Sequence, residues 1–240
     1  MGMMEDPGLG RMAYIPPCPH YPHCYGCSYI HLPYPEQIVR KQRALAQALA
    51  SYPSLGHLEV RPVIRSPRRL GYRARVKLVV RRGKERILTG LYAPESHRVV
   101  DISSCPVHPK EVNHVVDYVK VPVRELGIVP YDERHGSGQL RYLDLRYSFW
   151  RRELVLTVVT RREYFPEGPA LARAIRRKFP FVIGVVQNIN EASGNVIWGE
   201  RFRPLSGRDT LMERVGLLKL RYPPGVFSQA NPPVARKLYD

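Results

Sequence analysis

The stretch RARVKLVV, residues 73–80, is the part of the sequence that decides the fold. Apolar and basic residues alternate along it with a period of two, which is typical of a half-buried strand. One face would carry the apolar side chains Ala74, Val76, Leu78 and Val80. The other face would carry the basic side chains Arg73, Arg75 and Lys77. We therefore expect a strand that packs one face on a core and presents a basic strip on the other.

Further strands are expected after this one, and they are arranged in pairs. The turn-like RRGKER leads into ILTGLYAP, residues 87–94, which would complete a hairpin. Two more strand pairs are predicted, the first over 138–148 and 153–161 and the second over 181–190 and 194–200. Amphipathic helices are predicted over 34–56 and 168–179, because apolar residues recur there at helical spacing. Hairpins with intervening helices indicate an α+β fold with a mainly antiparallel sheet.

The charge balance points to a polyanionic partner. The 240-residue chain has 38 Lys and Arg against 21 Asp and Glu, which gives a formal net charge of +17. Arginine dominates, and its planar guanidinium suits bidentate phosphate contacts. No basic amphipathic helix with a bulky apolar face is evident, so we expect nucleic acid rather than a membrane as the partner.

Four cysteines form the second strong signal. CPHYPHCYGC, residues 18–27, places three at C-x5-C-x2-C spacing, and the fourth is Cys105. The first 18 residues lack the apolar segment of a secretion signal, so we expect a reducing, cytoplasmic setting in which such thiols bind metal. Clustering between prolines and tyrosines argues against four unrelated buried cysteines. Spacing alone leaves both tetrahedral zinc and a [4Fe-4S] cluster open.

The order of these motifs resembles a known family. The cysteine segment, a helix after YPEQ, GYRARVKLVV, LTGLYAPESHRVVDISSCPV, GNVIWGE and finally PPGVFSQANPPVARKLYD together resemble the iron–sulfur RNA uridine-5-methyltransferases. The resemblance runs from about Cys18 to the last residue. It implies a [4Fe-4S] cluster ligated by Cys18, Cys24, Cys27 and Cys105. It also implies S-adenosyl-L-methionine as cofactor and 5-methyluridine as product, in 23S rRNA by similarity to one branch, with tRNA as a second possibility.

Members of that family continue into a Rossmann-like domain that binds S-adenosylmethionine and supplies a nucleophilic cysteine. This sequence stops at ARKLYD. The resemblance therefore implies the amino-terminal, cluster-bearing and RNA-recognising part of the enzyme. We expect an α+β fold with a mainly antiparallel sheet, helices and a [4Fe-4S] loop, truncated before a Rossmann-like methyltransferase domain. No catalytic residue is expected in this chain, which would be inactive without the missing domain in cis or as a split partner.

The resemblance also divides the chain. Residues 1–11 would be a flexible tail, and 12–29 with 63–226 would form the central iron–sulfur and RNA-binding domain. The helical segment 30–62 would pack on the methyltransferase domain, of which 227–240 would be the start.

Two residues near the end of the sequence match family positions. Gln229 corresponds to the glutamine that contacts S-adenosylmethionine, with a polar group of a loop or helix cap as the alternative. Phe227 corresponds to the aromatic beside the extruded nucleotide, with core packing as the alternative. The other predicted RNA contacts are Arg68, Arg69, Tyr72, Arg73, Arg75 and Lys77. The competing function is a separate RNA-binding module with a cluster or zinc and no catalytic activity.

Overall fold

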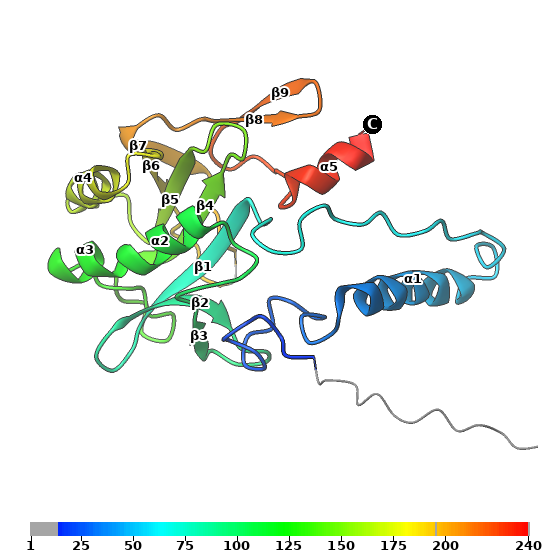
Figure 1. The fold of residues 1–240 in the computed structure, drawn as a ribbon. Helices are drawn as coiled ribbons and strands as arrows, with labels where there is room; N and C mark the ends of the chain where they lie inside the picture. Colours follow the sequence, from blue (N-terminus) through cyan, green and yellow to red (C-terminus); the bar gives the residue numbers. More distant parts are fainter. Residues whose placement is uncertain (1–13, 195, 240) are drawn as a thin grey trace, which may run out of the picture.

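A seven-stranded sheet forms the centre of the computed structural model, which describes residues 14–194 and 196–239 (Figure 1). The predicted tail, 1–11, lies outside these residues. The strands of the sheet lie in the order β3-β2-β1-β4-β5-β6-β7, and β8 and β9 form a separate hairpin. The strands are β1 Arg75–Arg82, β2 Ile87–Tyr92, β3 Val99–Asp101, β4 Leu140–Tyr147, β5 Leu154–Thr160, β6 Val182–Ile189, β7 Arg201–Gly207, β8 Leu211–Val215 and β9 Leu218–Tyr222. The helices are α1 Tyr34–Ala50, α2 Lys110–Tyr118, α3 Lys120–Glu125, α4 Gly168–Lys178 and α5 Pro232–Tyr239.

The main core lies between the sheet and the helices α2, α3 and α4. Strand β1 has the alternation that its sequence predicts, since Val76, Leu78 and Val80 are buried in this core. Strands β4 and β5 are buried along their whole length, which shows that the opposite face of the sheet is covered as well. On that face Val79 packs against Tyr142 and Val159, with Ile197 and Trp198 over them.

Helix α4 makes the sheet mixed rather than antiparallel. Its apolar side chains Leu171, Ala172 and Ile175 are buried against the sheet. Because the helix carries the chain back to the end from which β5 started, β6 pairs with β5 in parallel. The helix predicted over 168–179 thus lies between two strands that pair in parallel, which the expectation of a mainly antiparallel sheet did not include.

The predicted third strand pair is wrong in its second member. The partner of β6 is β7, whereas residues 194 and 196–200 lie in no strand. Two asparagine side chains, one near the end of β6 and one directly after it, donate hydrogen bonds to the backbone of that segment. Asn190 Nδ2 donates to the carbonyl oxygens of Val196 at 2.6 Å and Ile197 at 3.0 Å, and Asn188 Nδ2 donates to that of Gly199 at 2.8 Å. These bonds satisfy carbonyls that would otherwise need a strand partner.

The predicted fold class is also wrong. The structure is a sheet-dominated fold with a mixed seven-stranded sheet, and it shows no iron–sulfur loop as a structural element. The segment from residue 14 to residue 33 is a succession of turns and bends. Among the described residues, no group of three or more His, Cys, Asp or Glu side chains forms a site for a metal ion. No described helix combines the length and the apolar character needed to cross a membrane.

The core predicts a large difference between two leucines. Leu145 is 0% exposed in β4, so Leu145→Ala should lower the free energy of unfolding by about 2–5 kcal/mol through lost burial and a cavity. Leu217 is 92% exposed in the β8–β9 turn, and the matched change Leu217→Ala should have almost no effect. Urea unfolding followed by circular dichroism measures both. Equal losses of unfolding free energy in the two variants would show that Leu145 does not belong to the core.

Candidate functional site

The four cysteines line one small cavity of about 50 Å³. Cys18, Cys24 and Cys27 come from the turns before α1, and Cys105 follows β3. Hydrogen bonds join the two parts of the chain: the His20 ring Nε2 donates to the Ser104 carbonyl oxygen over 2.9 Å. The sequence-predicted thiols thus converge although Cys105 is far from the others in sequence.

The segment after β3 that carries Cys105 is held by a side chain of α2. The backbone N–H of Cys105 donates to Asn113 Oδ1 over 3.1 Å, and Asn113 Nδ2 donates to the Cys105 carbonyl oxygen over 3.0 Å. This reciprocal pair holds Cys105 in position without using its sulfur. The thiol therefore stays available to the cavity.

The cavity disfavours bare thiolates. Burial raises the pKa of the Cys105 thiol to about 11, and burial also raises the pKa of Cys27, with a further contribution from the neighbouring Cys24 and Cys18. Arg73 acts in the opposite direction and lowers the pKa of Cys27. Burial therefore favours the protonated thiols of Cys105 and Cys27.

Two nitrogen atoms on the wall of the cavity lack partners. Arg73 and His108 both line it, and within the described part of the chain Arg73 Nε and His108 Nδ1 are buried without a hydrogen bond. Burial lowers the pKa of His108 to about 4, and Arg73 adds to this effect. Buried polar atoms normally have partners, so the pair marks a place where an anionic group would be stabilised.

Three of the predicted RNA contacts line a larger cavity of about 590 Å³ beside the first one. These are Arg68, Arg69 and Tyr72, and both arginines are exposed. The Arg68 guanidinium lies 4.8 Å from the centre of the Phe149 ring, and that of Arg69 lies 4.9 Å from the Tyr34 ring. The cavity thus combines cationic groups with aromatic rings.

The predicted basic strip of Arg73, Arg75 and Lys77 is not an open face. Arg73 lies in the cysteine cavity, and Arg75 Nε lies 3.3 Å from the buried Asp144 Oδ1. Lys77 Nζ lies 5.2 Å from the centre of the Trp198 ring, and burial lowers the pKa of this lysine. Ile197 and Trp198 cover this face of β1. The predicted alternation of the strand is therefore confirmed, whereas the predicted exposure of its basic face is wrong.

An arginine of β4 anchors the segment that carries Phe227 and Gln229. Arg146 Nη1 donates to the Pro223 carbonyl oxygen over 3.0 Å, and Nη2 donates to that of Val226 over 2.7 Å. Its Nε pairs with Asp144 Oδ2 over 3.0 Å. Phe227 is 72% exposed and Gln229 is exposed too, so the anchored segment presents both side chains to solvent.

Sequence reasoning missed the part played by Asp144 and Arg146. Their signal was present in LRYLDLRY, where a carboxylate and a guanidinium two residues apart share one face of a strand. A charged pair inside an otherwise apolar strand indicates a buried ion pair.

Comparisons with known proteins give these cavities a context. No family model matches the chain. An uncharacterized RNA methyltransferase of Geobacter sulfurreducens is 36% identical over 98% of this chain and 47% of its own length. One from Halalkalibacterium halodurans is 32% identical over 93% of this chain and 49% of its own length. The chain is similar to RNA methyltransferases. It spans about half the length of the curated relatives it matches.

A solved structure is similar as well. The crystal structure of Pyrococcus abyssi tRNA (uracil-54, C5)-methyltransferase in complex with S-adenosyl-L-homocysteine has a TM-score of 0.72 and 26% sequence identity, over 90% of this chain and 48% of that one. The predicted likeness to RNA methyltransferases is thus confirmed at this level. The predicted cluster-bearing α+β class is not confirmed. The sheet-dominated structure of this chain matches the solved structure over 90% of its residues.

The buried ion pair gives a testable prediction. Arg146→Leu leaves Asp144 buried with Arg75 as its remaining cation, so the free energy of unfolding should fall by about 3 kcal/mol. The double variant Asp144→Asn/Arg146→Leu should recover part of this loss because the buried charge is gone. Denaturant unfolding measures both effects.

The same substitution should also release the carboxyl-terminal segment. Hydrogen–deuterium exchange in peptides covering 225–231 should become faster in Arg146→Leu. The control is Arg221→Leu, at an exposed arginine of β9, which should leave both exchange and stability near the wild-type values. Unchanged exchange in Arg146→Leu would show that the segment is held by other contacts.

Proposed function

We propose that this chain recognises RNA and holds a thiolate-bound centre for an S-adenosylmethionine-dependent RNA (uracil-C5)-methyltransferase. One observation carries the proposal: the cysteine cavity and the cavity with Arg68, Arg69 and Tyr72 share a wall. The residues of that wall are Gly26, Cys27, Ile30 and Val107. A centre that fixed Cys27 to Cys105 would therefore also fix one side of the cavity suited to RNA.

The ligands of the centre in this proposal are Cys18, Cys24, Cys27 and Cys105. Four thiols with no other cysteine in the chain are the donor set of a [4Fe-4S] cluster or of zinc. Cys18, Cys24, Cys27 and Cys105 would hold the centre by their thiolates, because all four line the same cavity. Its net negative charge would suit the guanidinium of Arg73, whose Nε has no hydrogen-bond partner among the described residues.

The centre is proposed to act structurally. When bound, it would supply a cross-link between the turns before α1 and the segment after β3. Methyl transfer from S-adenosylmethionine needs no redox step, and the residues of this chain would serve to position RNA. Arg73 would balance the charge of the thiolates from the wall of their cavity.

RNA would bind in the larger cavity through stacking and phosphate contacts. Its lining includes the aromatic rings of Tyr29, Tyr34 and Tyr72 and the cations Lys41, Arg68 and Arg69. Stacking of a base on an aromatic ring contributes about 1–3 kcal/mol. The exposed Phe227 would provide a further ring near the extruded nucleotide.

The RNA proposed by the motif resemblance is 23S rRNA, with 5-methyluridine as product. Transfer RNA is the second candidate, and the observation that favours it is the likeness to the P. abyssi tRNA methyltransferase. That neighbour was solved with S-adenosyl-L-homocysteine, which supports S-adenosylmethionine as the methyl donor here. Gln229 is the residue of this chain proposed to contact the donor.

The domain division also becomes part of the proposal. In Figure 1, α1 extends away from the sheet, and among its residues only Ile38 is buried. Val39 and Leu45 are 45% and 51% exposed. We propose that this helical segment, 30–62, packs against the methyltransferase domain, that 12–29 and 63–226 form the central iron–sulfur and RNA-binding domain, and that 227–240 is the start of the methyltransferase domain.

The ligand set generates the first prediction. Cys105→Ser should lose the iron and acid-labile sulfide of anaerobically purified protein, because Cys105 alone ties the centre to the segment after β3. His23→Ala, at an exposed position of the same turns as the other ligands, should keep both. Iron and sulfide analysis with the visible spectrum is the measurement. One zinc and no sulfide in the wild type would favour a zinc-held module instead.

The absence of a spare thiol generates the second prediction. The enzymes that this sequence resembles use a cysteine thiolate that adds to C6 of uracil before C5 takes the methyl group and loses its proton. All four cysteines of this chain are assigned to the centre. The 240-residue chain should therefore bind RNA yet transfer no methyl group from labelled S-adenosylmethionine to 23S rRNA or tRNA. Turnover by this chain would show that one cysteine is the nucleophile.

A further inference from the structure

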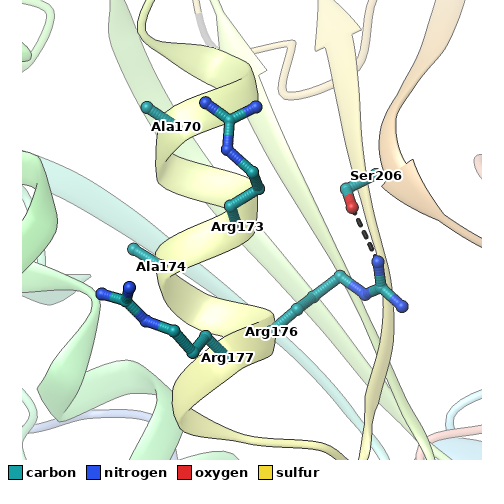
Figure 2. A pocket seen from close by; sticks show the side chains of 6 residues that line it. All are labelled: Ala170, Arg173, Ala174, Arg176, Arg177 and Ser206. Atoms are coloured by element: carbon teal, nitrogen blue, oxygen red, sulfur yellow. Dashed lines mark hydrogen bonds between the residues drawn. The ribbon is translucent and has the colours of Figure 1, made fainter.

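Helix α4 presents a basic hollow on the side away from the core. Arg173, Arg176 and Arg177 line it together with Ala170 and Ala174, and Figure 2 shows Arg176 pointing toward Ser206. The hollow has a volume of about 570 Å³ and extends to Ser206 on β7. Spacings of three and four residues place the three guanidinium groups on one side of the helix. Neither the cysteine cavity nor the Tyr72 cavity includes any of these residues.

One of the three arginines is held in place. Arg176 Nη1 donates to Ser206 Oγ over 2.7 Å, and its Nε donates to the Val182 carbonyl oxygen over 3.3 Å. The guanidinium lies close to Gly207, where an added Cβ would come within 2.9 Å of Arg176 Cζ. This glycine has φ +76°, so both its conformation and its missing side chain make room for the arginine. The hollow therefore contains a cation whose position is fixed in advance.

The other two arginines bear charges that nothing in the described structure balances. Arg173 and Arg177 are exposed, and within residues 14–194 and 196–239 neither makes an ion pair or a hydrogen bond. No acidic side chain of the described part of the chain lines the hollow. Like charges at i and i+4 on a helix destabilise it by about 0.2–0.5 kcal/mol. An anion bound between them would remove this repulsion.

The helix dipole explains only part of the arrangement. Arg176, Arg177 and Lys178 lie in the last turn of α4, where cations interact favourably with the carbonyl end. Arg173 lies a turn earlier, beyond the range of that effect. The two small alanine side chains that line the hollow also leave space beside the guanidinium groups, which the dipole does not require.

We propose that this hollow binds phosphate groups of the RNA backbone, as a second contact distant from the cysteine cavity. Planar guanidinium groups bind phosphate in bidentate geometry, and the chain has a formal net charge of +17. Helix α4 contacts β6 and β7 at one end of the sheet, whereas Cys105 follows β3 at the other end (Figure 1). The inference rests on the proposed RNA-directed function and adds where the backbone is held.

The test compares two double variants with the same change in net charge. Arg173→Gln/Arg177→Gln removes the exposed cations of the hollow, and Lys219→Gln/Arg221→Gln removes two exposed cations of β9. Binding of a fluorescently labelled rRNA or tRNA to the full chain is measured by anisotropy at several salt concentrations. Each lost phosphate contact should reduce the slope of log K against log salt by about 0.7–0.9. We expect the slope of the α4 variant to fall by nearly twice this amount, because two phosphate contacts are lost. The slope of the β9 variant should stay close to that of the wild type.

The outcomes separate this inference from the function on which it rests. No RNA binding by the wild-type chain would overturn the proposed function. Wild-type binding with an unchanged slope in the α4 variant, or with equal losses in both variants, would overturn the phosphate site alone. Loss of binding to a polyglutamate peptide without loss of RNA binding would assign the hollow to an acidic protein and also overturn it. Thermal unfolding within about 2 °C of the wild type confirms that the α4 variant is folded.

Discussion

The buried carboxylate of Asp144 is the constraint on which the site depends. It lies in β4, the middle strand of the sheet, with a side chain 1% exposed, and only cations can make such burial tolerable. Arg75 of the neighbouring strand and Arg146 of the same strand provide them. Arg146 then uses its remaining N–H groups on the carbonyls of Pro223 and Val226. One buried charge thus fixes the relation between the sheet and the segment that presents Phe227 and Gln229.

A second buried cation organises the other covering segment. Arg141 is 0% exposed, and its guanidinium donates to the carbonyl oxygens of Asn190 at 2.9 Å, Ala192 at 2.7 Å and Gly194 at 3.1 Å. With the asparagine contacts described above, these bonds hold the loop that places Trp198 over β1. Both faces of the sheet are therefore closed, one by helices and one by polar attachment of loops.

Local patterns in the sequence predicted some elements and could not predict others. Strand β1 and helix α4 follow from spacing, because one face of each packs on the core, whereas helix α1 follows from its spacing although only Ile38 of it is buried. Helices α2 and α3 and the β8–β9 hairpin have no counterpart among the predicted elements. The loop at 194–200 depends on Arg141, Asn188 and Asn190, whose contacts are distant in sequence and leave no periodic signal. Ile197 and Trp198 cover the face of the sheet on which Arg75 and Lys77 lie, which explains why these two side chains are half-buried. The four cysteines line one cavity, and their grouping could be expected from residue type and spacing.

Under the RNA-binding proposal, the width of the sheet sets a lower limit on the length of an RNA that contacts both the α4 hollow and the cysteine segment. Seven strands spaced about 4.8 Å apart make a sheet roughly 30 Å across, and the α4 hollow and the cysteines belong to opposite ends of it. An RNA that touches both must extend across that distance, whereas a trimmed oligonucleotide can reach only one. If the proposed RNA-directed function holds, a minimal fragment centred on the target uridine would therefore bind less tightly than a longer folded RNA.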